Sequence, residues 1–173
     1  MFTSTAFYQR SLSFGNYRTY SFAVIFVTGN LLLPQLTHLV PNGGRTLLPI
    51  YFFTLIAGYK FGPSVGLLTA VLSPLINNLL FGMPPAIVLP AILIKSCLLA
   101  FSAAIIASYY KKISLLHVLL VVLAYQLIGS AAEWIITGSF KSASQDFTIG
   151  IPGMLIQIFG GYFLLKKLSG YGN

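Results

Sequence analysis

The sequence predicts an all-α integral membrane protein, a bundle of six transmembrane helices with both chain ends in the cytoplasm. Hydrophobic residues make up 57% of its 173 residues and charged residues only 7%, which is too few charges to cover a water-soluble domain. Long apolar runs recur along the whole chain and are separated by short connections. Basic residues gather at alternate ends of these runs, a bias typical of proteins that cross the membrane several times.

The charge distribution predicts the orientation. When the chain is threaded six times through a bilayer, seven of its ten basic residues fall on the same side. These residues are Arg10, Arg18, Lys60, Lys111, Lys112, Lys166 and Lys167. Arg45 and Lys141 fall in outer loops, and Lys95 lies within a helix. The positive-inside rule therefore assigns the group of seven to the cytoplasm.

Turn signals divide the chain, a single membrane domain over 1–173, into spans of about 20 residues. The N-terminal segment 1–18 is expected in the cytoplasm, and the predicted spans are 19–40, 46–61, 63–82, 86–110, 115–138 and 147–168. The first span ends before the turn-forming run 41–44, and Pro63 starts the third span directly after Gly62. The third and fifth spans end at Gly82 and Gly138. Lysine pairs at 111–112 and 166–167 end the fourth and sixth spans on the inner side.

Composition also excludes several classes of protein. The net charge of +8 is dispersed along the predicted cytoplasmic edges, so anionic lipid headgroups, rather than nucleic acid, are the expected counter-charge. Cys97 is the single cysteine, which permits no intrachain disulfide and no thiolate metal cluster. The first 18 residues lack the apolar core of a cleaved signal peptide. The first span is therefore expected to act as the insertion signal.

Polar side chains within the predicted spans are biased toward the outer halves. On the fifth span, Gln126, Ser130 and Glu133 follow a helical spacing that continues to Thr137 and places them on one face. An ionised side chain at membrane depth costs about 2.5 to 3.5 kcal/mol and usually faces a cavity or a partner. We therefore expect an outward-facing substrate pocket. Its candidate residues are Asn77, Asn78, Lys95, Glu133, Trp134, Gln157, His38 and Asn42.

Each candidate also has a structural explanation. Lys95 and Glu133 can neutralise each other, and asparagines such as Asn77 commonly join neighbouring helices by hydrogen bonds. His38 at a helix end is more often a hydrogen-bonding residue than a ligand. Trp134 fits either the interfacial aromatic belt or the wall of a pocket for a planar ligand. The sequence leaves these alternatives open.

Small residues form a second pattern, on the third span. Gly62, Gly66 and Ala70 repeat every four residues along one face. Such faces let two helix backbones approach closely. Packing within the bundle is the default explanation, and contact with a partner protein is the alternative.

Motifs for catalysis are missing from the sequence. There is no P-loop, so an ATP-driven role requires other subunits. Glu133 and Asp146 are the two acidic residues, and no paired histidine motif or Gly-x-Ser-x-Gly motif occurs. We therefore expect that the chain is not an enzyme and that it has no cofactor and no metal site. We interpret it as a protein that binds or transports a solute.

Several segments resemble the substrate-binding, or S, component of energy-coupling factor (ECF) vitamin transporters. The resemblance covers most of the chain, and it rests on the order and spacing of short motifs within a six-span chain. The motifs are Leu48 and Pro49, Ala57 and Gly58, Phe61 to Pro63, Gly66 to Leu68, Ser73 to Leu75, Gly82 to Pro85, and Gly150 to Gly153 with Gln157. One departure is that the first span lacks the Ala-x-x-x-Ala pair often seen in the family.

The resemblance implies a high-affinity capture subunit for a vitamin or related micronutrient, in the cytoplasmic membrane of a prokaryote. It further implies a membrane-embedded T component and two ATPase subunits as partners. The loop from Pro41 to Arg45 would gate the ligand site, and Gly62, Gly66 and Ala70 would belong to the surface that couples to the T component. Two alternatives remain at this point: a structural or assembly subunit without a ligand, and a small facilitator or channel that works alone.

Overall fold

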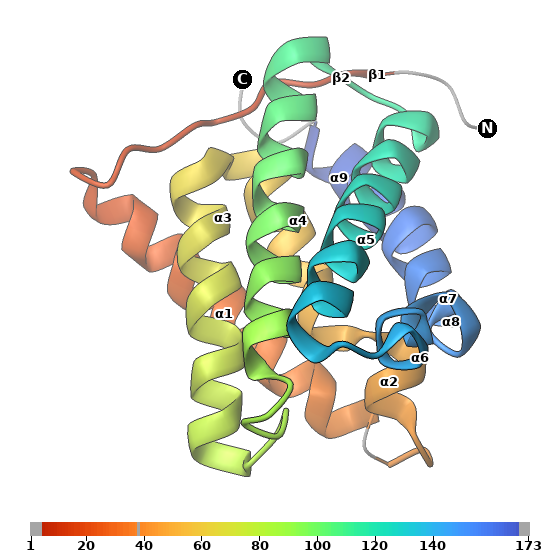
Figure 1. The fold of residues 1–173 in the computed structure, drawn as a ribbon. Coiled ribbons are helices and arrows are strands. Elements are labelled where there is room, and N and C mark those ends of the chain that lie inside the picture. Colours follow the sequence, from red (N-terminus) through yellow and green to blue (C-terminus); the bar gives the residue numbers. More distant parts are fainter. Residues whose placement is uncertain (1–4, 38, 170–173) are drawn as a thin grey trace.

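The computed structural model describes residues 5–37 and 39–169, and most of this part of the chain is helical (Figure 1). Its long helices are α1 (Tyr17–Thr37), α3 (Phe52–Phe81), α4 (Leu89–Tyr110) and α5 (Leu115–Thr137). Four segments of the described chain are long and apolar enough to cross a membrane, namely Tyr17–Thr37, Pro49–Phe81, Leu89–Tyr110 and Leu115–Thr137. The chain is thus an all-α protein of the membrane, as its composition predicts.

Short elements complete the described chain. They are β1 (Thr5–Ala6), α2 (Gly43–Leu47), the 3₁₀ helix η1 (Pro49–Tyr51), β2 (Lys112–Ile113), α6 (Phe140–Ala143), α7 (Gln145–Thr148), α8 (Ile151–Leu155), the π-helical turn η2 (Ile156–Gly160) and α9 (Gly161–Ser169). Helix α2 occupies the predicted first outer loop. The predicted start of the second span at Thr46 is wrong, because Leu48 takes a left-handed conformation with φ 48° and interrupts the helix before Pro49.

The chain reverses direction inside α3, at Gly62. This residue has φ 84° and ψ −173°, a backbone conformation open almost only to glycine. A Cβ atom added to Gly66 would lie 2.8 Å from the Cα of Gly58, although eight residues of straight helix would separate the two by about 12 Å. The parts of α3 before and after Gly62 therefore lie against each other. The turn predicted at Gly62 and Pro63 is present.

Small residues bring α3 against α4. A Cβ atom on Gly58 would lie 2.6 Å from the carbonyl oxygen of Ala100 and 3.2 Å from the Cβ of Ala103. Gly66 also abuts Ala100, and Ala70 is fully buried. Three segments of backbone thus meet without intervening side chains, the arrangement that small residues permit in membrane helices.

The predicted partner-coupling residues lie inside this packing. Gly62 and Gly66 are buried, and Ala70 has no exposed surface. A Cβ atom on Gly62 would meet the side chain of Ser11 at 2.6 Å. Packing within the bundle therefore accounts for all three residues, and none of them is exposed to contact a partner protein.

The N-terminal segment crosses one end of the bundle as a strap, residues 5–12 (Figure 1). Strand β1 pairs antiparallel with β2, and the amide of Phe7 donates to the carbonyl of Lys111 at 3.0 Å. Further along, the amide of Arg10 donates to the carbonyl of Lys60 at 2.7 Å. The Gln9 side chain donates to the carbonyls of Gly58 and Ala104. The sequence predicted a cytoplasmic segment here, but it did not predict that these hydrogen bonds would fix the segment to the bundle.

The outer surface of the helices is apolar. Large side chains such as Val24 (64% exposed), Leu79 (80%) and Ile135 (84%) point away from the bundle. The core lies where α3, α4, α5 and α9 meet, and includes the fully buried Leu99 and Tyr162. An apolar exterior around a packed interior is the pattern expected of helices surrounded by lipid.

Replacing Gly62 with asparagine is predicted to destabilise the protein by about 1 to 3 kcal/mol, because its backbone conformation is essentially restricted to glycine. Gly82→Asn is the matched control. Gly82 has φ 66° and ψ 12°, a left-handed helix end that asparagine tolerates, with open space around its Cα. Thermal unfolding of the two detergent-solubilised variants measures their melting temperatures. Equal melting temperatures would contradict the role assigned to Gly62.

Candidate functional site

An ion cluster joins α4, α5 and α7. The ammonium group of Lys95 donates to Oε2 of Glu133 at 2.6 Å and to Oδ2 of Asp146 at 2.9 Å. The three side chains are 4%, 11% and 16% exposed. Since Glu133 and Asp146 are both of the chain's two acidic residues, one lysine binds every carboxylate side chain of the protein.

Neighbouring residues hold the cluster in place. The methylene groups of Lys95 pass over Gly129, where a Cβ atom would lie 2.5 Å from the lysine Cγ. The hydroxyl of Ser142 donates to Oε1 of Glu133 at 3.0 Å. Ser142 is itself positioned in α6, because its amide donates to the side chain of the N-cap residue Ser139. Glycine thus provides the room for the lysine, and α6 provides a donor for the carboxylate.

A second group of polar side chains lies where α5 meets η2. The hydroxyl of Tyr125 donates to Oε1 of Gln157 at 2.8 Å, and both residues are fully buried. The ring of Tyr51 lies 5.5 Å from that of Tyr125, tilted by 48°. Gln157 belongs to the π-helical turn, a departure from the α-helix that is frequent at functional sites.

Several buried polar atoms near these groups have no hydrogen-bonding partner among the described residues. Gln126 is fully buried, and neither its amide nitrogen nor its carbonyl oxygen is bonded. The amide nitrogen of Gln157 and the hydroxyls of Ser130 and Ser96 share this condition. An unbonded buried polar group costs about 1 to 3 kcal/mol. Such groups therefore indicate a site that is completed by a bound molecule or by water.

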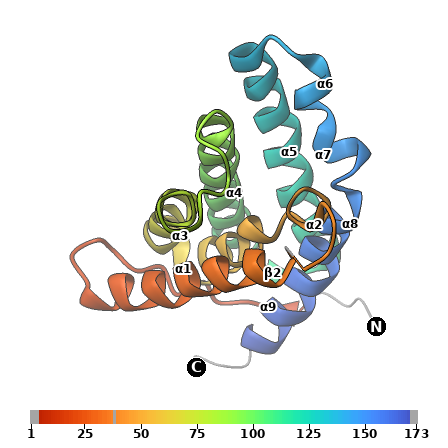
Figure 2. The ribbon, with the colours of Figure 1, turned by 90° about the horizontal axis from the view of Figure 1, so that it is seen from below.

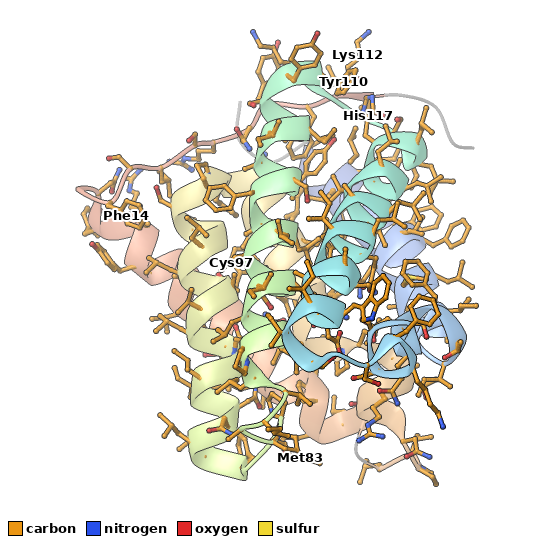
Figure 3. The ribbon with its side chains drawn as sticks, viewed as in Figure 1. Phe14, Met83, Cys97, Tyr110, Lys112 and His117 are labelled. Atoms are coloured by element: carbon orange, nitrogen blue, oxygen red, sulfur yellow. The ribbon has the colours of Figure 1, made fainter. Side chains whose placement is uncertain are left out.

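The stripe predicted on α5 leads from these groups to the cluster. Gln126, Ser130 and Glu133 lie on one helix face and are all buried. Glu133 is close to the end of α5 at Thr137, on the side of the bundle where Met83 lies and opposite to Lys112 (Figure 3). The stripe therefore runs inward from that end of the molecule.

The segments 43–48 and 150–155 meet at this end of the molecule. Helix α2 lies beside α8 when the molecule is viewed from below (Figure 2). A Cβ atom on Gly153 would lie 2.5 Å from the backbone of Leu47, and one on Gly150 would lie 3.1 Å from the Leu48 side chain. This close approach requires glycine at position 153, inside α8, and at position 150, directly before α8. Helix α2, which overlaps the predicted gate 41–45, thus packs against α8, the helix that leads into the π-helical turn with Gln157.

Asn77 belongs to a different network, between α1 and α3. Its amide donates to the carbonyls of Asn30 and Ser73 at 2.9 and 3.1 Å. The amide of Asn30 in turn donates to the hydroxyls of Thr54 and Ser73. These side chains are buried and bonded to one another. The structural explanation, hydrogen bonding between helices, accounts for Asn77.

The other predicted site residues lie apart from the ion cluster. Asn78 donates to the carbonyl of Pro84 at 2.7 Å and ties down the loop after α3. Trp134 is 51% exposed and packs edge-on against Phe140. Asn42 is exposed ahead of α2, and the predicted residue His38 lies outside the described residues. Of the predicted set, the structure joins Lys95 to Glu133 and places Gln157 in a separate group, bonded to Tyr125.

Sequence analysis missed Asp146, Ser142, Tyr51 and Tyr125 as site residues. Asp146 had a usable signal, since a chain with two acidic residues and one lysine inside a span has few ways to balance that charge. The sequence carried no signal for Tyr51 and Tyr125 as site residues, because tyrosine is common in apolar helices. Within 5–37 and 39–169, no three His, Cys, Asp or Glu side chains are grouped to hold a metal ion.

The fold and the site define an α-helical membrane protein with a buried ion cluster near one end of its bundle. Comparison of the chain with protein-family models, with curated proteins and with solved structures finds no match. The function is therefore argued from the cluster and its surroundings.

Replacing Lys95 with methionine is predicted to destabilise the protein by about 3 to 5 kcal/mol, because it leaves two carboxylates buried without a counter-charge. Adding Glu133→Gln and Asp146→Asn to Lys95→Met removes that charge and is predicted to restore most of the loss. Unfolding in mixed detergent micelles measures the free energy of each variant. A triple variant as unstable as the single one would show that the lysine acts through its packing alone.

Proposed function

We propose that this chain is the substrate-capture subunit of an ATP-driven importer of the ECF type, which binds a vitamin or a related micronutrient. The observation that carries the proposal is the set of buried, unbonded side-chain atoms of Gln126, Ser130 and Gln157. Gln126 and Ser130 share the face of α5 that carries Glu133 of the ion cluster. A folded protein contains few unbonded buried polar groups, and each needs an explanation. A capture subunit uses them to bind its ligand.

A sixfold crossing of the bilayer is consistent with the helices. The segment Pro49–Phe81 has 33 residues, and a straight helix of that length would be about 50 Å long, well beyond the hydrocarbon core. Because the chain reverses at Gly62, the segment supplies two arms, a short one before Gly62 and a longer one after it, which correspond to the predicted second and third spans. The run from α8 through η2 to α9, Ile151–Ser169, supplies another crossing beside α1, α4 and α5.

Charge supports an orientation with both chain ends inside. The backbones of Lys60 and Lys111 bond to the N-terminal strap, so these lysines and Arg10 lie at one end of the bundle. A shallow groove of about 500 Å³ near the strap is lined by Arg10, Arg18, Tyr17, Ser21, Phe22 and Ile25. Its two guanidinium groups beside apolar side chains suit the anionic headgroup layer of a cytoplasmic membrane face. An importer of the ECF type would lie in the cell membrane of a prokaryote.

In the proposed mechanism the solute enters from outside, at the end where Met83 lies (Figure 3). Helix α2 and the α6 to α7 connection enclose it above the ion cluster. A membrane-embedded T component and two ATPase subunits would then reorient the bundle and release the solute inside. The apolar exterior favours such a movement, because charged side chains would be costly to carry through hydrocarbon.

A second candidate function is a structural or assembly subunit without a ligand. The full pairing of Lys95 and the closed network around Asn77 favour it, since both are explained by packing alone. The unbonded Gln126 argues against it. The two candidates therefore differ in what they predict for that residue.

Replacing Gln126 with leucine separates the candidates. The variant is predicted to melt at a higher temperature, because it removes an unbonded buried amide worth about 1 to 3 kcal/mol. A capture subunit must also lose affinity, by about tenfold or more for one hydrogen-bonding group. Calorimetric titration of the purified wild-type and Gln126→Leu proteins with the water-soluble vitamins measures the affinity.

The control for this titration is Leu127→Ala, on the exposed side of the same turn, where the residue is 60% exposed. It is predicted to leave the affinity unchanged. Stabilisation by Gln126→Leu without any detectable vitamin binding to the wild-type protein would support the structural subunit and contradict capture.

The orientation has its own test, which uses Cys97 as the single cysteine. In a Cys97→Ser background, cysteine placed at Met83 is predicted to react with a membrane-impermeant maleimide on intact cells. Cysteine placed at Lys112 is predicted to react only after the membrane is opened, because the two residues lie at opposite ends of the bundle (Figure 3). The reverse pattern would contradict the positive-inside assignment.

A further inference from the structure

We infer that the captured solute is a cation: an amine or a positively charged nitrogen heterocycle whose charge binds beside Asp146. This inference rests on the proposed function and names the class of its substrate. The ion cluster holds one ammonium group and two carboxylates, so it carries a formal charge of −1. At membrane depth an uncompensated charge is costly, and a cationic guest would cancel it.

No side chain of the described chain supplies the missing positive charge. Both ion pairs found in this part of the protein use the same Lys95. Arg45 and Lys141, the two cations of the outer connections, make no ion pair with Glu133 or Asp146. The ion cluster therefore keeps its formal charge of −1.

Hydrogen bonding points to Asp146 as the place where the charge is received. Both oxygens of Glu133 are occupied, Oε2 by Lys95 and Oε1 by Ser142. Oδ2 of Asp146 accepts from Lys95, whereas Oδ1 accepts no hydrogen bond from any described residue. The Asp146 side chain is also the most exposed of the three, at 16%. A carboxylate oxygen with open acceptor positions is a strong partner for an N–H donor that carries positive charge.

The surrounding groups define the rest of the guest. The unbonded amide of Gln126 and the amide nitrogen of Gln157 offer both donors and an acceptor. The ring of Tyr125, whose hydroxyl bonds Gln157, and the adjacent ring of Tyr51 are almost fully buried, so a guest that displaced their neighbours would meet aromatic surface, which also attracts cations. An anionic solute would instead meet the excess carboxylate and be repelled. A planar, positively charged molecule with its own hydrogen-bonding edge fits this chemistry.

A set of ring-matched probes tests the sign of the charge. Pyridoxamine, pyridoxine and 4-pyridoxic acid share a ring and carry an amine, an alcohol and a carboxylate at the same position. Thiamine, riboflavin and biotin extend the set as a cation, a neutral molecule and an anion. Calorimetric titration of the purified full-length protein is expected to give the tightest binding for a cation within the set. An anion or a neutral compound as the tightest ligand would overturn the inference and leave capture intact.

The variant Asp146→Asn links the charge to the residue. It is expected to weaken binding of the best cation by about tenfold or more and to leave any neutral ligand nearly unaffected. Lys112→Gln, a unit change of charge at the opposite end of the bundle, is the matched control and is expected to change neither. Equal weakening of cationic and neutral ligands by Asp146→Asn would overturn the assignment.

The protein without ligand provides a second, independent measurement. Because Asp146→Asn leaves a neutral Lys95 and Glu133 pair, its melting temperature is expected to rise above that of the wild type. An unchanged or lower value would mean that a proton already neutralises the cluster, and would overturn the charge argument even if a vitamin binds. Failure of every probe to bind, together with a raised melting temperature, would instead refute capture while the excess charge stands.

Discussion

Hydrocarbon supplies no water to satisfy a polar group, so every buried donor, acceptor and charge in this protein must find its partner within the chain or in a guest. Lys95 of α4 shows the consequence most directly, because it binds both carboxylate side chains of the molecule, one from α5 and one from α7. The position of α7 relative to α4 and α5 depends on these contacts. Gln126 shows the opposite case, a buried amide whose partner the described chain does not contain.

Much of the fold follows from local sequence signals. The apolar runs predict the long helices, and glycine with proline at Gly62 predicts the reversal, because one residue takes the unusual backbone conformation and the next starts a helix. The break at Leu48 carries no such signal, since leucine rarely adopts a positive φ and does so here within tertiary contacts to the α8 region. The strap was equally hidden, because its hydrogen bonds are to residues far away in the sequence.

The sequence likewise predicts one part of the candidate site and not another. Helical spacing on α5 predicts that Gln126 and Glu133 share a face, and the burial of both residues agrees with this. Spacing within one helix cannot say which neighbouring helix it meets, so the bond from Asp146 to Lys95 and the separate network of Asn77 emerge only from the three-dimensional arrangement. The small residues Gly62 and Gly66 illustrate the same limit. Their spacing indicates close packing but not whether the neighbour is this chain or another.

The strap bears on how the bundle can move. Backbone bonds from Phe7, Arg10 and Leu12 fasten it to the end of α4 and to the reversal inside α3, at one end of the molecule. At the other end, α2, α6 and α7 are short helices joined by few residues. The strapped end is therefore closed by backbone hydrogen bonds between distant segments, whereas the opposite end is closed by side-chain contacts and helix packing. If the protein captures a solute as proposed, release at the strapped end would require the whole bundle to reorient, because the strap would have to lose its backbone bonds before that end could open.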